Sequence, residues 1–365
     1  MRIGVDAHVL TGKFQGSRTY LLNLYRAVTA RESGHEFVFY GHWNGDKPFG
    51  AKVSYRNFPS ASRWKRLLYD SRAIAKEDRI ELYHSTYIAP VGLACRSLVT
   101  IHDVLFETVP EYFSKPFVWR SRFLVRRSAR TADQVQTISR FSSELITSRY
   151  EVASNRVRLV APGTDLRKFH GEGRTESRSI IRTAYAVSDY ILTVGRLEPR
   201  KNHLGLIEAY AEIKRKNKNL VPLVIIGQPD FGYRSILRRI GQLGLESDVK
   251  ILSNVPDDML PHFYRAARIF VYPSFAEGFG IPVLESMACG VPTVASGDSA
   301  IPEVVGDGGL LVDPKDPLDI AKAIERILDS PELAEKLSDR ARNIARVWTW
   351  ERAASQYLDS IKALA

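Results

Sequence analysis

Two glutamates in the stretch 272–290 are spaced in a way that suits sugar chemistry. Glu277 and Glu285 are separated by seven residues, and glycines, a proline and an apolar run lie between them. A β-type run at 269–272 precedes them, so the order predicts a strand, a glycine loop and a helix. The N-terminus of that helix favours an anion, and carboxylates beside a phosphate would accept hydrogen bonds from flanking hydroxyls. We therefore expect a diphosphate between a sugar and a ribose, although the spacing alone also fits two surface glutamates.

A second cluster, ILTVGRLEPRKN at 191–202, carries the cations that a diphosphate needs. A β-type run ends at Gly195, and three cations follow within six residues. Arg196 and Lys201 offer a guanidinium fork and a point charge to phosphate oxygens. Asn202 suits the N-cap of the helix that follows. Because open α/β sheets bind ligands at the carboxyl ends of their strands, we expect both clusters on one edge of one sheet.

The segments VGRLEPRKNH and PSFAEGFGIPVLESMACGVPTVAS resemble the retaining nucleotide-sugar glycosyltransferases of the GT-B fold, the group 1 or family 4 type. The resemblance is strongest over about residues 188–315 and extends more weakly over nearly the whole chain. It implies an α/β protein with two Rossmann-like domains whose parallel sheets face a central cleft. Residues 1–172, with a returning helix at 350–365, would bind the acceptor, and residues 173–349 would bind the nucleotide sugar.

The resemblance also implies roles for single residues. Catalysis would use His102, Arg196, Lys201 and Glu277. The donor would be bound by Gly16, Gly195, Arg196, Lys201, Asn254, Val255, Glu277, Gly278, Phe279, Gly280, Ile281 and Glu285. Within these sets, Glu277 would hold a hydroxyl of the donor sugar, Glu285 the ribose, and His102 the transferred sugar. The loop at Asn254 and Val255 would lie against the base.

Other residues of the first half are open to two interpretations. Gly16, with Gly12 as a second choice, matches the family's loop near the donor phosphate or the acceptor, but it also suits an ordinary turn. His84 and Asp103 are weaker candidates for polar contacts near His102. Ser139 suits a helix N-cap, with an acceptor contact as the alternative.

The resemblance implies a metal-independent reaction. The chain has no D-x-D motif and no His, Cys, Asp or Glu cluster with ligand spacing, and Arg196 and Lys201 would stabilise the leaving diphosphate in place of a metal ion. The acceptor would attack from the front face with the leaving phosphate as base. We expect GDP-mannose as donor, with UDP-sugars next. A nucleotide-sugar epimerase, a phosphorylase, or a non-catalytic nucleotide-sugar-binding subunit are the rival functions.

The charge of the chain is concentrated in its first half. Residues 1–180 contain 29 Lys and Arg against 17 Asp and Glu, whereas residues 181–365 contain 23 against 24. Two segments, 62–69 and 114–130, combine cations with aromatic residues, which is typical of a helix on an anionic membrane surface. A solvated basic helix or a partner protein are alternatives, and no nucleic-acid motif is present. We expect a cytoplasmic protein, peripheral at the inner face of the membrane, with a glycan or a lipid-diphosphate-linked glycan as acceptor.

The hydrophobic pattern predicts alternating strands and helices throughout. In the first half, strands are expected at 2–6, 37–40, 82–84, 98–101, 134–138 and 157–160. In the second half they are expected at 190–194, 221–226, 249–252, 269–272, 292–295 and 309–312. Three helices are expected to end the chain, at 321–328, 331–347 and 350–364. Such alternation is typical of parallel sheets with crossover helices.

Overall fold

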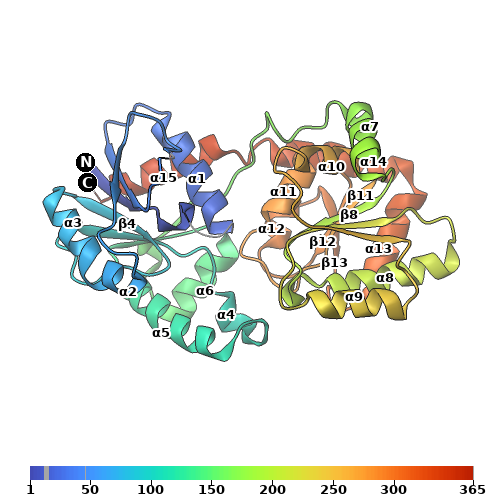
Figure 1. Ribbon diagram of the computed structural model, residues 1–365, viewed down its shortest axis with the longest axis horizontal. Helices are drawn as coiled ribbons and strands as arrows, with labels where there is room; N and C mark the ends of the chain where they lie inside the picture. Colours follow the sequence, from blue (N-terminus) through green and yellow to red (C-terminus); the bar gives the residue numbers. More distant parts are fainter. Residues whose placement is uncertain (12–15, 46, 365) are drawn as a thin grey trace. The chain divides into compact units, whose positions relative to one another are not determined.

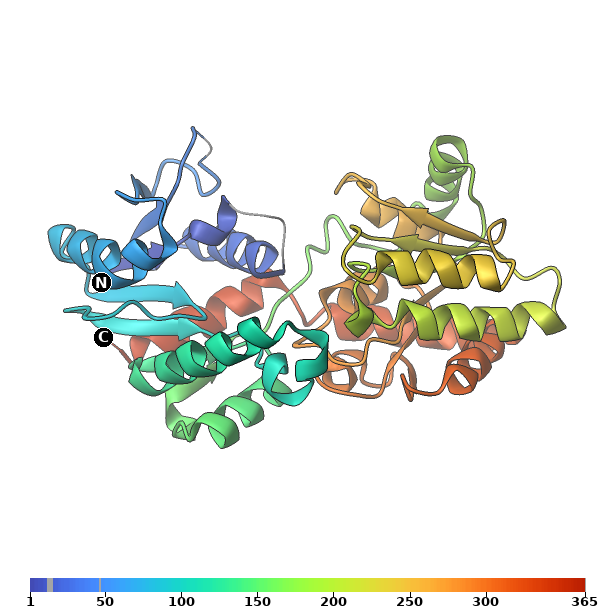
Figure 2. The same ribbon diagram turned by 60° about the horizontal axis from the view of Figure 1, so that its bottom comes forward.

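The computed structural model describes residues 1–11, 16–45 and 47–364, which form two compact units (Figure 1). The first unit contains residues 1–163 together with the helix that begins at Trp350, and the second contains 164–349. Each unit is a parallel sheet with helices on both faces (Figure 2). This confirms the fold class expected from the sequence. Gly12 lies outside the described residues.

The first unit is built on a seven-stranded sheet in the order β3-β2-β1-β4-β5-β6-β7. Its strands are β1 (Arg2–Asp6), β2 (Glu36–Gly41), β3 (Ser54–Asn57), β4 (Leu82–Thr86), β5 (Arg96–Thr100), β6 (Gln134–Thr137) and β7 (Val157–Leu159). Six of these strands are the predicted ones with slightly different ends. The sequence did not predict β3, because this edge strand has the polar sequence SYRN and is only half buried.

Helices of the first unit cover both faces of its sheet. They are α1 (Gly16–Thr29), α2 (Arg63–Lys65), α3 (Ser71–Glu77), α4 (Leu105–Thr108), α5 (Lys115–Thr131), α6 (Arg140–Tyr150) and α15 (Trp350–Lys362), with a π-helical turn, η2 (Arg66–Asp70), between α2 and α3. Three short 3-10 turns are η1 (His8–Leu10), η3 (Pro110–Tyr112) and η4 (Ser154–Arg156). Ser139 caps α6 by accepting a hydrogen bond from the backbone N–H of Ser142.

The C-terminal helix α15 is held on the first unit by buried polar contacts. The Tyr25 hydroxyl of α1 lies 2.5 Å from His84 Nδ1 and 2.8 Å from the Tyr357 hydroxyl of α15. Gln136 of β6 donates to Ser360 of α15 at 2.6 Å. Burial, with a smaller effect of the neighbouring His102, lowers the pKa of His84 to about 3, so its ring is neutral.

The second unit is built on a six-stranded parallel sheet in the order β10-β9-β8-β11-β12-β13. Its strands are β8 (Ile191–Val194), β9 (Leu223–Ile226), β10 (Val249–Leu252), β11 (Ile269–Tyr272), β12 (Thr293–Ser296) and β13 (Gly309–Val312). All six predicted strands are confirmed. The chain leaves β8 towards β9 on one side and later returns to place β11 on the other, so the loops after β8 and β11 meet at the point where the strand order reverses.

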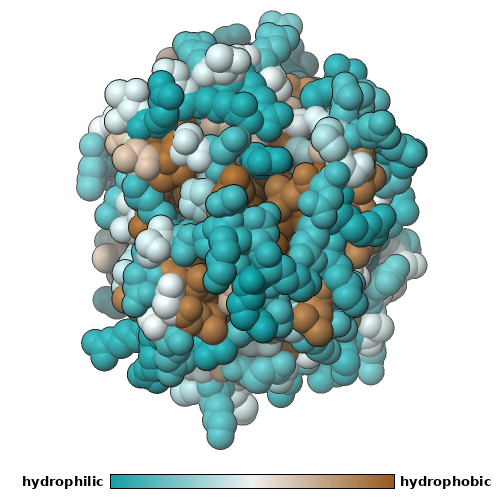
Figure 3. All heavy atoms as spheres, turned by 90° about the vertical axis from the view of Figure 1, so that its right-hand side faces the viewer, coloured by the Kyte–Doolittle hydropathy of each residue, from teal (hydrophilic) through white to brown (hydrophobic). Residues whose placement is uncertain are grey.

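Helices of the second unit complete the alternation. They are α7 (Arg174–Tyr185), α8 (His203–Lys216), α9 (Tyr233–Gln242), α10 (Leu260–Ala266), α11 (Ile281–Ala288), α12 (Ile301–Val305), α13 (Pro317–Asp329) and α14 (Pro331–Ala345), with one 3-10 turn, η5 (Pro199–Lys201). Helix α13 begins earlier than predicted because Asp316 caps it and Pro317 opens it. The face of this unit in Figure 3 is mostly hydrophilic, with hydrophobic side chains in small separate areas.

No helix among the described residues is long and apolar enough to cross a membrane.

Candidate functional site

The predicted phosphate-binding loop follows β8 and is fixed by Asn202. This residue adopts a left-handed conformation with φ of 55° and caps α8, its side chain accepting from the N–H of Gly205 at 3.1 Å. Its amide also donates to the carbonyls of Pro273 at 3.0 Å and Pro314 at 2.6 Å. Asn202 therefore joins the loops after β8, β11 and β13, a larger role than the predicted N-cap.

Glu277, in the loop after β11, forms ion pairs with two cationic side chains of the loop after β8. Lys201 Nζ lies 2.6 Å from Glu277 Oε1, and Arg200 Nη1 lies 3.1 Å from Glu277 Oε2. The Tyr272 hydroxyl, at the end of β11, donates to Glu277 Oε1 at 3.1 Å and accepts from Lys201 at 2.7 Å. The structure thus brings together Lys201 and Glu277, which lie 76 positions apart in the sequence.

Burial and these ion pairs set the protonation state of the cluster. Burial alone would raise the pKa of Glu277, but Arg200 and Lys201 outweigh it and hold that pKa at about 2. Burial is the largest effect on Lys201 and lowers its pKa, which Glu277 partly offsets. Glu277 is therefore ionised near neutral pH and acts only as a hydrogen-bond acceptor.

Arg196 lies at the end of the same strand but has a different partner. Its guanidinium pairs with Asp230 at 2.5 Å, in the loop after β9, and half of its side chain is exposed. From the sequence, Arg196 and Lys201 were expected to bind one diphosphate together. In this structure each cation is paired with a carboxylate, so an anion would have to compete with Asp230 and Glu277 for them.

Gly280 and the first turn of α11 form the helix terminus at which the sequence predicts an anion. Gly280 has φ of 105°, and a Cβ at this position would lie 2.5 Å from the side chain of Ile301. Gly280 is the N-cap residue, and no side chain caps the N–H groups of the first turn. The neighbouring Phe279 is buried and packs edge-on against Trp348, so its side chain supports the loop from inside.

Glu285 lies inside α11, as predicted, and is partly buried. Its Oε2 accepts a hydrogen bond from the Tyr264 hydroxyl of α10 at 3.0 Å. Burial raises the pKa of Glu285 to about 7, and the bond from Tyr264 opposes that rise. Glu277 is therefore ionised near neutral pH, whereas Glu285 titrates there, because their surroundings differ.

Asn254, predicted to lie near the base, follows β10 with φ of 59°. Its Oδ1 accepts from Gln228 Nε2 at 2.9 Å, which connects the loops after β9 and β10. With Val255 it lies at the carboxyl end of β10, two strands from β8 in the same sheet.

His102, in the first unit, lies just beyond the carboxyl end of β5, after Ile101, and is buried. Its ring packs edge-on against Tyr20, with centroids 4.8 Å apart, and lies 5.4 Å from the ring of Tyr87. Burial lowers the pKa of His102 to about 4, so the imidazole is neutral near pH 7. One of its ring nitrogens can donate a hydrogen bond and the other can accept one. Asp103 Oδ1 accepts from the N–H of Leu105 at the start of α4.

Gly16 opens helix α1, and a Cβ added there would meet no described atom within 4 Å. Nothing in the described part of the chain fills the space around this position, in agreement with either interpretation of the glycine.

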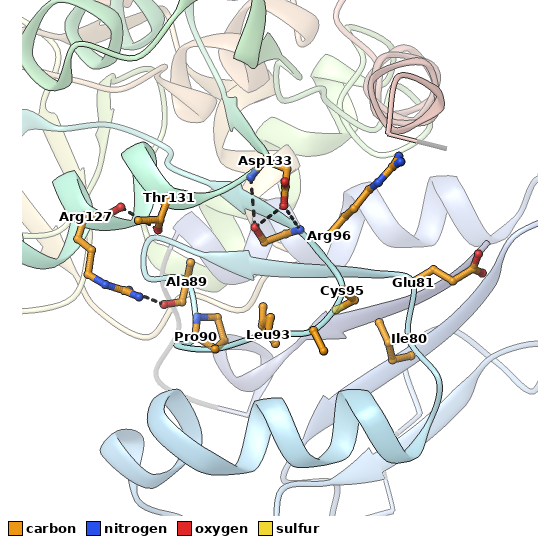
Figure 4. Close-up of a pocket in the computed structure, with 13 residues that line it drawn as sticks. Ile80, Glu81, Ala89, Pro90, Leu93, Cys95, Arg96, Arg127, Thr131 and Asp133 are labelled. Atoms are coloured by element: carbon orange, nitrogen blue, oxygen red, sulfur yellow. Dashed lines mark hydrogen bonds between the residues drawn. The ribbon is translucent and has the colours of Figure 1, made fainter.

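A cavity of about 680 Å³ lies in the first unit, at the amino ends of three strands of its sheet (Figure 4). Glu81 precedes β4, Arg96 begins β5 and Asp133 precedes β6, so the cavity is at the amino ends of these strands. Arg127 of α5, in its wall, donates to the carbonyl of Ala89 at 3.3 Å. Since ligands of open α/β sheets bind at the carboxyl ends of the strands, this cavity is not part of the candidate site.

Comparison with known proteins identifies the family. Residues 181–344 match the profile of "Glycosyl transferases group 1", and residues 14–168 match that of "Glycosyltransferase Family 4". The chain is 33% identical over 272 residues to O-antigen chain mannosyltransferase B of Escherichia coli, a match that covers 74% of this chain and 71% of that one. The chain belongs to the group 1, family 4 glycosyltransferases.

A second relative matches a smaller part of this glycosyltransferase, whereas two solved structures match it over its whole length. It is 32% identical over 226 residues to D-inositol 3-phosphate glycosyltransferase of Frankia alni, which covers 58% of this chain and 54% of the relative. Among solved structures, sucrose-phosphate synthase of Thermosynechococcus elongatus has a TM-score of 0.81 at 22% identity, covering 100% and 98% of the two chains. HepE of Anabaena, in complex with UDP-glucose, has a TM-score of 0.78 at 19% identity and full coverage of both chains. Both structures agree with a GT-B fold.

Three residues of this glycosyltransferase's candidate site, Arg200, Tyr264 and Tyr272, were not predicted from the sequence. Arg200 stands beside Lys201, and its charge was visible, but nothing local indicated that it reaches Glu277. Tyr272 and Tyr264 were hidden because each reads as an apolar core residue of its strand or helix, while its hydroxyl reaches a carboxylate. Among the residues that the structure describes, no group of three or more His, Cys, Asp or Glu could hold a metal ion.

Replacing Gly227 by alanine is expected to displace the loop after β8, which carries Lys201. Gly227 follows β9, and a Cβ there would lie 1.9 Å from the backbone oxygen of Gly195. The two strand ends would have to separate, which costs roughly 1–3 kcal/mol and displaces the loop that carries Lys201. We expect a lower thermal midpoint and at least tenfold weaker nucleotide-sugar binding by calorimetry.

The matched control for Gly227 is Gly241→Ala, in helix α9. A Cβ at Gly241 would meet Glu246 at 3.5 Å, an ordinary contact, and alanine favours a helix. This variant should keep both stability and binding. Normal binding by Gly227→Ala would contradict the close approach of the two strands.

Proposed function

We propose that this glycosyltransferase moves mannose, with retention of configuration and without a metal ion, from GDP-mannose to a glycan or lipid-linked glycan. The reaction would serve the assembly of a cell-surface polysaccharide. The observation that carries the proposal is the grouping of Lys201, Arg196, Glu277 and the N-terminus of α11 around the carboxyl ends of β8 and β11. Mannose is supported by the similarity to the mannosyltransferase of E. coli.

In this proposal each group of the site has a separate role. Arg196 and Lys201 stabilise the charge that develops on the leaving diphosphate, helped by the N–H groups of the first turn of α11. Glu277, already ionised, accepts a hydrogen bond from a hydroxyl of the donor sugar. Glu285 holds the ribose, and Asn254 lies near the base. For His102 we retain a contact with the transferred sugar, to which a neutral ring is suited.

A transfer assay tests the proposal. Purified enzyme is given GDP-mannose, a lipid-linked glycan acceptor and EDTA, and release of GDP is measured together with mannose in the acceptor. Equal amounts of both products are expected. Turnover with a UDP-sugar alone would show that the donor is a UDP-sugar, the class of ligand that HepE holds in its complex with UDP-glucose. Epimerised sugar or phosphorolysis without acceptor would indicate the rival enzymes, and no turnover with any donor would favour a non-catalytic binding subunit.

The proposed ribose contact makes donor affinity depend on pH. The pKa of Glu285 is about 7 in the free enzyme, and an ionised carboxylate is the stronger acceptor for a hydroxyl. Affinity for GDP-mannose should therefore rise roughly tenfold between pH 6 and pH 8, following ionisation of this carboxyl. The esterified diphosphate of the donor does not titrate in this range, so calorimetry at several pH values reports the protein group.

Two variants accompany the pH series. Glu285→Gln should bind more weakly and with no change between pH 6 and pH 8. Glu335→Gln, on the exposed face of α14, should behave as the wild type. A pH dependence that survives in Glu285→Gln would assign it to another group and contradict the ribose contact.

We further propose that the first unit docks on an anionic membrane. Helix α5 and the segment 63–70 expose large apolar side chains beside arginines and lysines: Trp64, Leu68, Tyr69, Trp119 and Phe123 are 41–78% exposed. Burial and the nearby guanidinium groups of Arg120 and Arg66 lower the pKa of Arg63, as expected if the two segments lie together. The smaller residues Val118 and Val125 of α5 pack inside the unit instead.

A vesicle-binding experiment tests this surface. Burying one aromatic side chain contributes about 1.5–3 kcal/mol, so Trp119→Ser with Phe123→Ser should weaken binding to vesicles containing phosphatidylglycerol by at least tenfold. Leu318→Ser, which removes a half-exposed residue of α13, is the control and should bind normally. Equal binding by the double variant and the wild type, or equal binding to neutral vesicles, would contradict membrane docking through this surface.

A further inference from the structure

Arg200 crosses from the loop after β8 to the loop after β11. Its Nη1 donates to the carbonyl of Ala276 at 2.6 Å and lies 3.1 Å from Glu277 Oε2. Its Nη2 donates to Glu198 Oε1 at 2.5 Å. The backbone of the same residue accepts from the N–H of Phe275 at 2.9 Å, so both its main chain and its side chain contact the loop after β11.

Arg200 and Lys201 bind different oxygens of Glu277 and differ in what they can do next. Lys201 contacts Oε1 with a flexible ammonium group that can also turn to a phosphate, whereas Arg200 contacts Oε2 with a planar fork already fixed by Glu198 and Ala276. The Tyr272 hydroxyl is the third group on this carboxylate. If the charge of Lys201 is engaged by a diphosphate, Arg200 is the cation that stays with Glu277.

We propose that Arg200 is a positioning residue. It keeps Glu277 ionised and oriented towards the donor sugar while the donor diphosphate binds Lys201. The inference rests on the proposed function, since it gives Lys201 and Glu277 different parts of one donor. A carboxylate that lost its compensation in this buried place would take up a proton, and a protonated Glu277 would donate where it must accept. Arg200 touches neither donor nor acceptor in this account and acts through Glu277.

A purely structural role for Arg200 predicts something different. If it only ties the two loops together, its loss would lower the thermal midpoint and the amount of folded enzyme, but the protonation of Glu277 in the folded fraction would not change. The charge-holding role predicts that removal of the guanidinium raises the pKa of Glu277, and that a lysine in its place largely restores it. The pKa of Glu277 therefore separates the two roles.

The experiment follows the Glu277 carboxyl by ¹³C NMR in full-length enzyme with labelled glutamate, its signal assigned by its absence in Glu277→Gln. Titration between pH 3 and pH 8, with and without GDP, is compared for wild type, Arg200→Gln and Arg200→Lys. We expect no titration of Glu277 within this range in the wild type, because its pKa lies at about 2. In Arg200→Gln we expect a midpoint at or above pH 4, higher still with GDP bound, and in Arg200→Lys a return to a midpoint below the range. An unchanged titration in Arg200→Gln would overturn the inference.

Turnover of the same variants keeps this test separate from that of the proposed function. With the donor that the wild type uses, kcat of Arg200→Gln relative to the wild type should fall by about tenfold at one pH unit below the midpoint found in the titration and recover at higher pH, whereas Arg200→Lys should lose less than tenfold. A fall in kcat that is the same at every pH would favour the structural role. A wild type that turns over no nucleotide sugar would refute the proposed function, and the titration without GDP would still measure what Arg200 does to Glu277. Should Arg200→Gln not fold, Arg200→Lys carries the test, and an unmoved pKa there together with a large pH-independent loss of kcat would overturn the inference.

Discussion

Replacing Lys201 by alanine is expected to lower kcat by about 10²–10³, or roughly 2.7–4 kcal/mol of transition-state stabilisation. The charge on the leaving diphosphate grows as the sugar–phosphate bond breaks, and Lys201 is a buried cation at the switch point of the sheet, next to the loop that leads to α11. Its contribution is therefore larger in the transition state than in the bound donor, and the donor KM should change much less than kcat. Steady-state release of nucleotide in the presence of acceptor measures both constants.

The control for Lys201 is Lys216→Ala. Lys216 lies at the end of α8 with 65% of its side chain exposed and a surface ion pair to Glu325 at 3.4 Å, so its loss should leave kcat unchanged. A Lys201→Ala enzyme with normal kcat and only a raised KM would mean that Lys201 binds the donor and the transition state equally. Normal values of both kcat and KM would show that Lys201 contacts neither the donor nor the transition state.

Replacing Glu277 by glutamine is expected to lower both stability and turnover. The change leaves Lys201 and Arg200, each with less than a fifth of its side chain exposed, without their shared counter-charge. Removing one partner of a buried ion pair costs roughly 3–5 kcal/mol. Chemical denaturation at pH 7 should show a loss of this order, and kcat should fall as well because glutamine offers the sugar hydroxyl a weaker acceptor.

The pH dependence of stability gives a second test of the Glu277 cluster. Because the folded-state pKa of Glu277 is lowered from 4.5 to about 2, its contribution is present above pH 4.5 and is lost as the pH falls towards 2. Between these values the wild type should lose stability that Glu277→Gln does not lose. Glu208→Gln, which breaks a surface pair with Arg239, serves as control and should follow the wild type. Identical acid unfolding of wild type and Glu277→Gln would contradict the assigned ion pairs.

The parts of the fold that the sequence predicted are those where local pattern and burial coincide. Strands such as β8 and β11 are short apolar runs bounded by glycine or proline, and they are fully or nearly fully buried. Strand β3 was missed because its polar edge sequence carries no such pattern. The start of α13 was missed because its first turn is set by the cap Asp316 rather than by hydrophobic residues.

The site shows the same limit for side chains. Lys201 and Glu277 were predicted to share one edge of a sheet because parallel strands end together, and this rule depends only on strand order. The partners that set their charge could not be predicted, because Arg200 turns towards the neighbouring loop only in the folded protein. Arg196 shows the converse, since its pair with Asp230 depends on the shape of the loop after β9. Long-range pairing of charges is decided by tertiary structure, which sequence spacing does not encode.

Calorimetry of the full-length enzyme with GDP, UDP and ADP and their sugar conjugates, in EDTA, tests the proposed diphosphate site, and it is repeated with Lys201→Ala. We expect one nucleotide and its conjugate to bind selectively without a divalent metal, with GDP-mannose as the expected ligand. Lys201→Ala should weaken this binding modestly while abolishing most turnover. Binding of none of these ligands, or binding only after a divalent metal is added, would contradict a cationic diphosphate site built from Arg196, Lys201 and the N-terminus of α11.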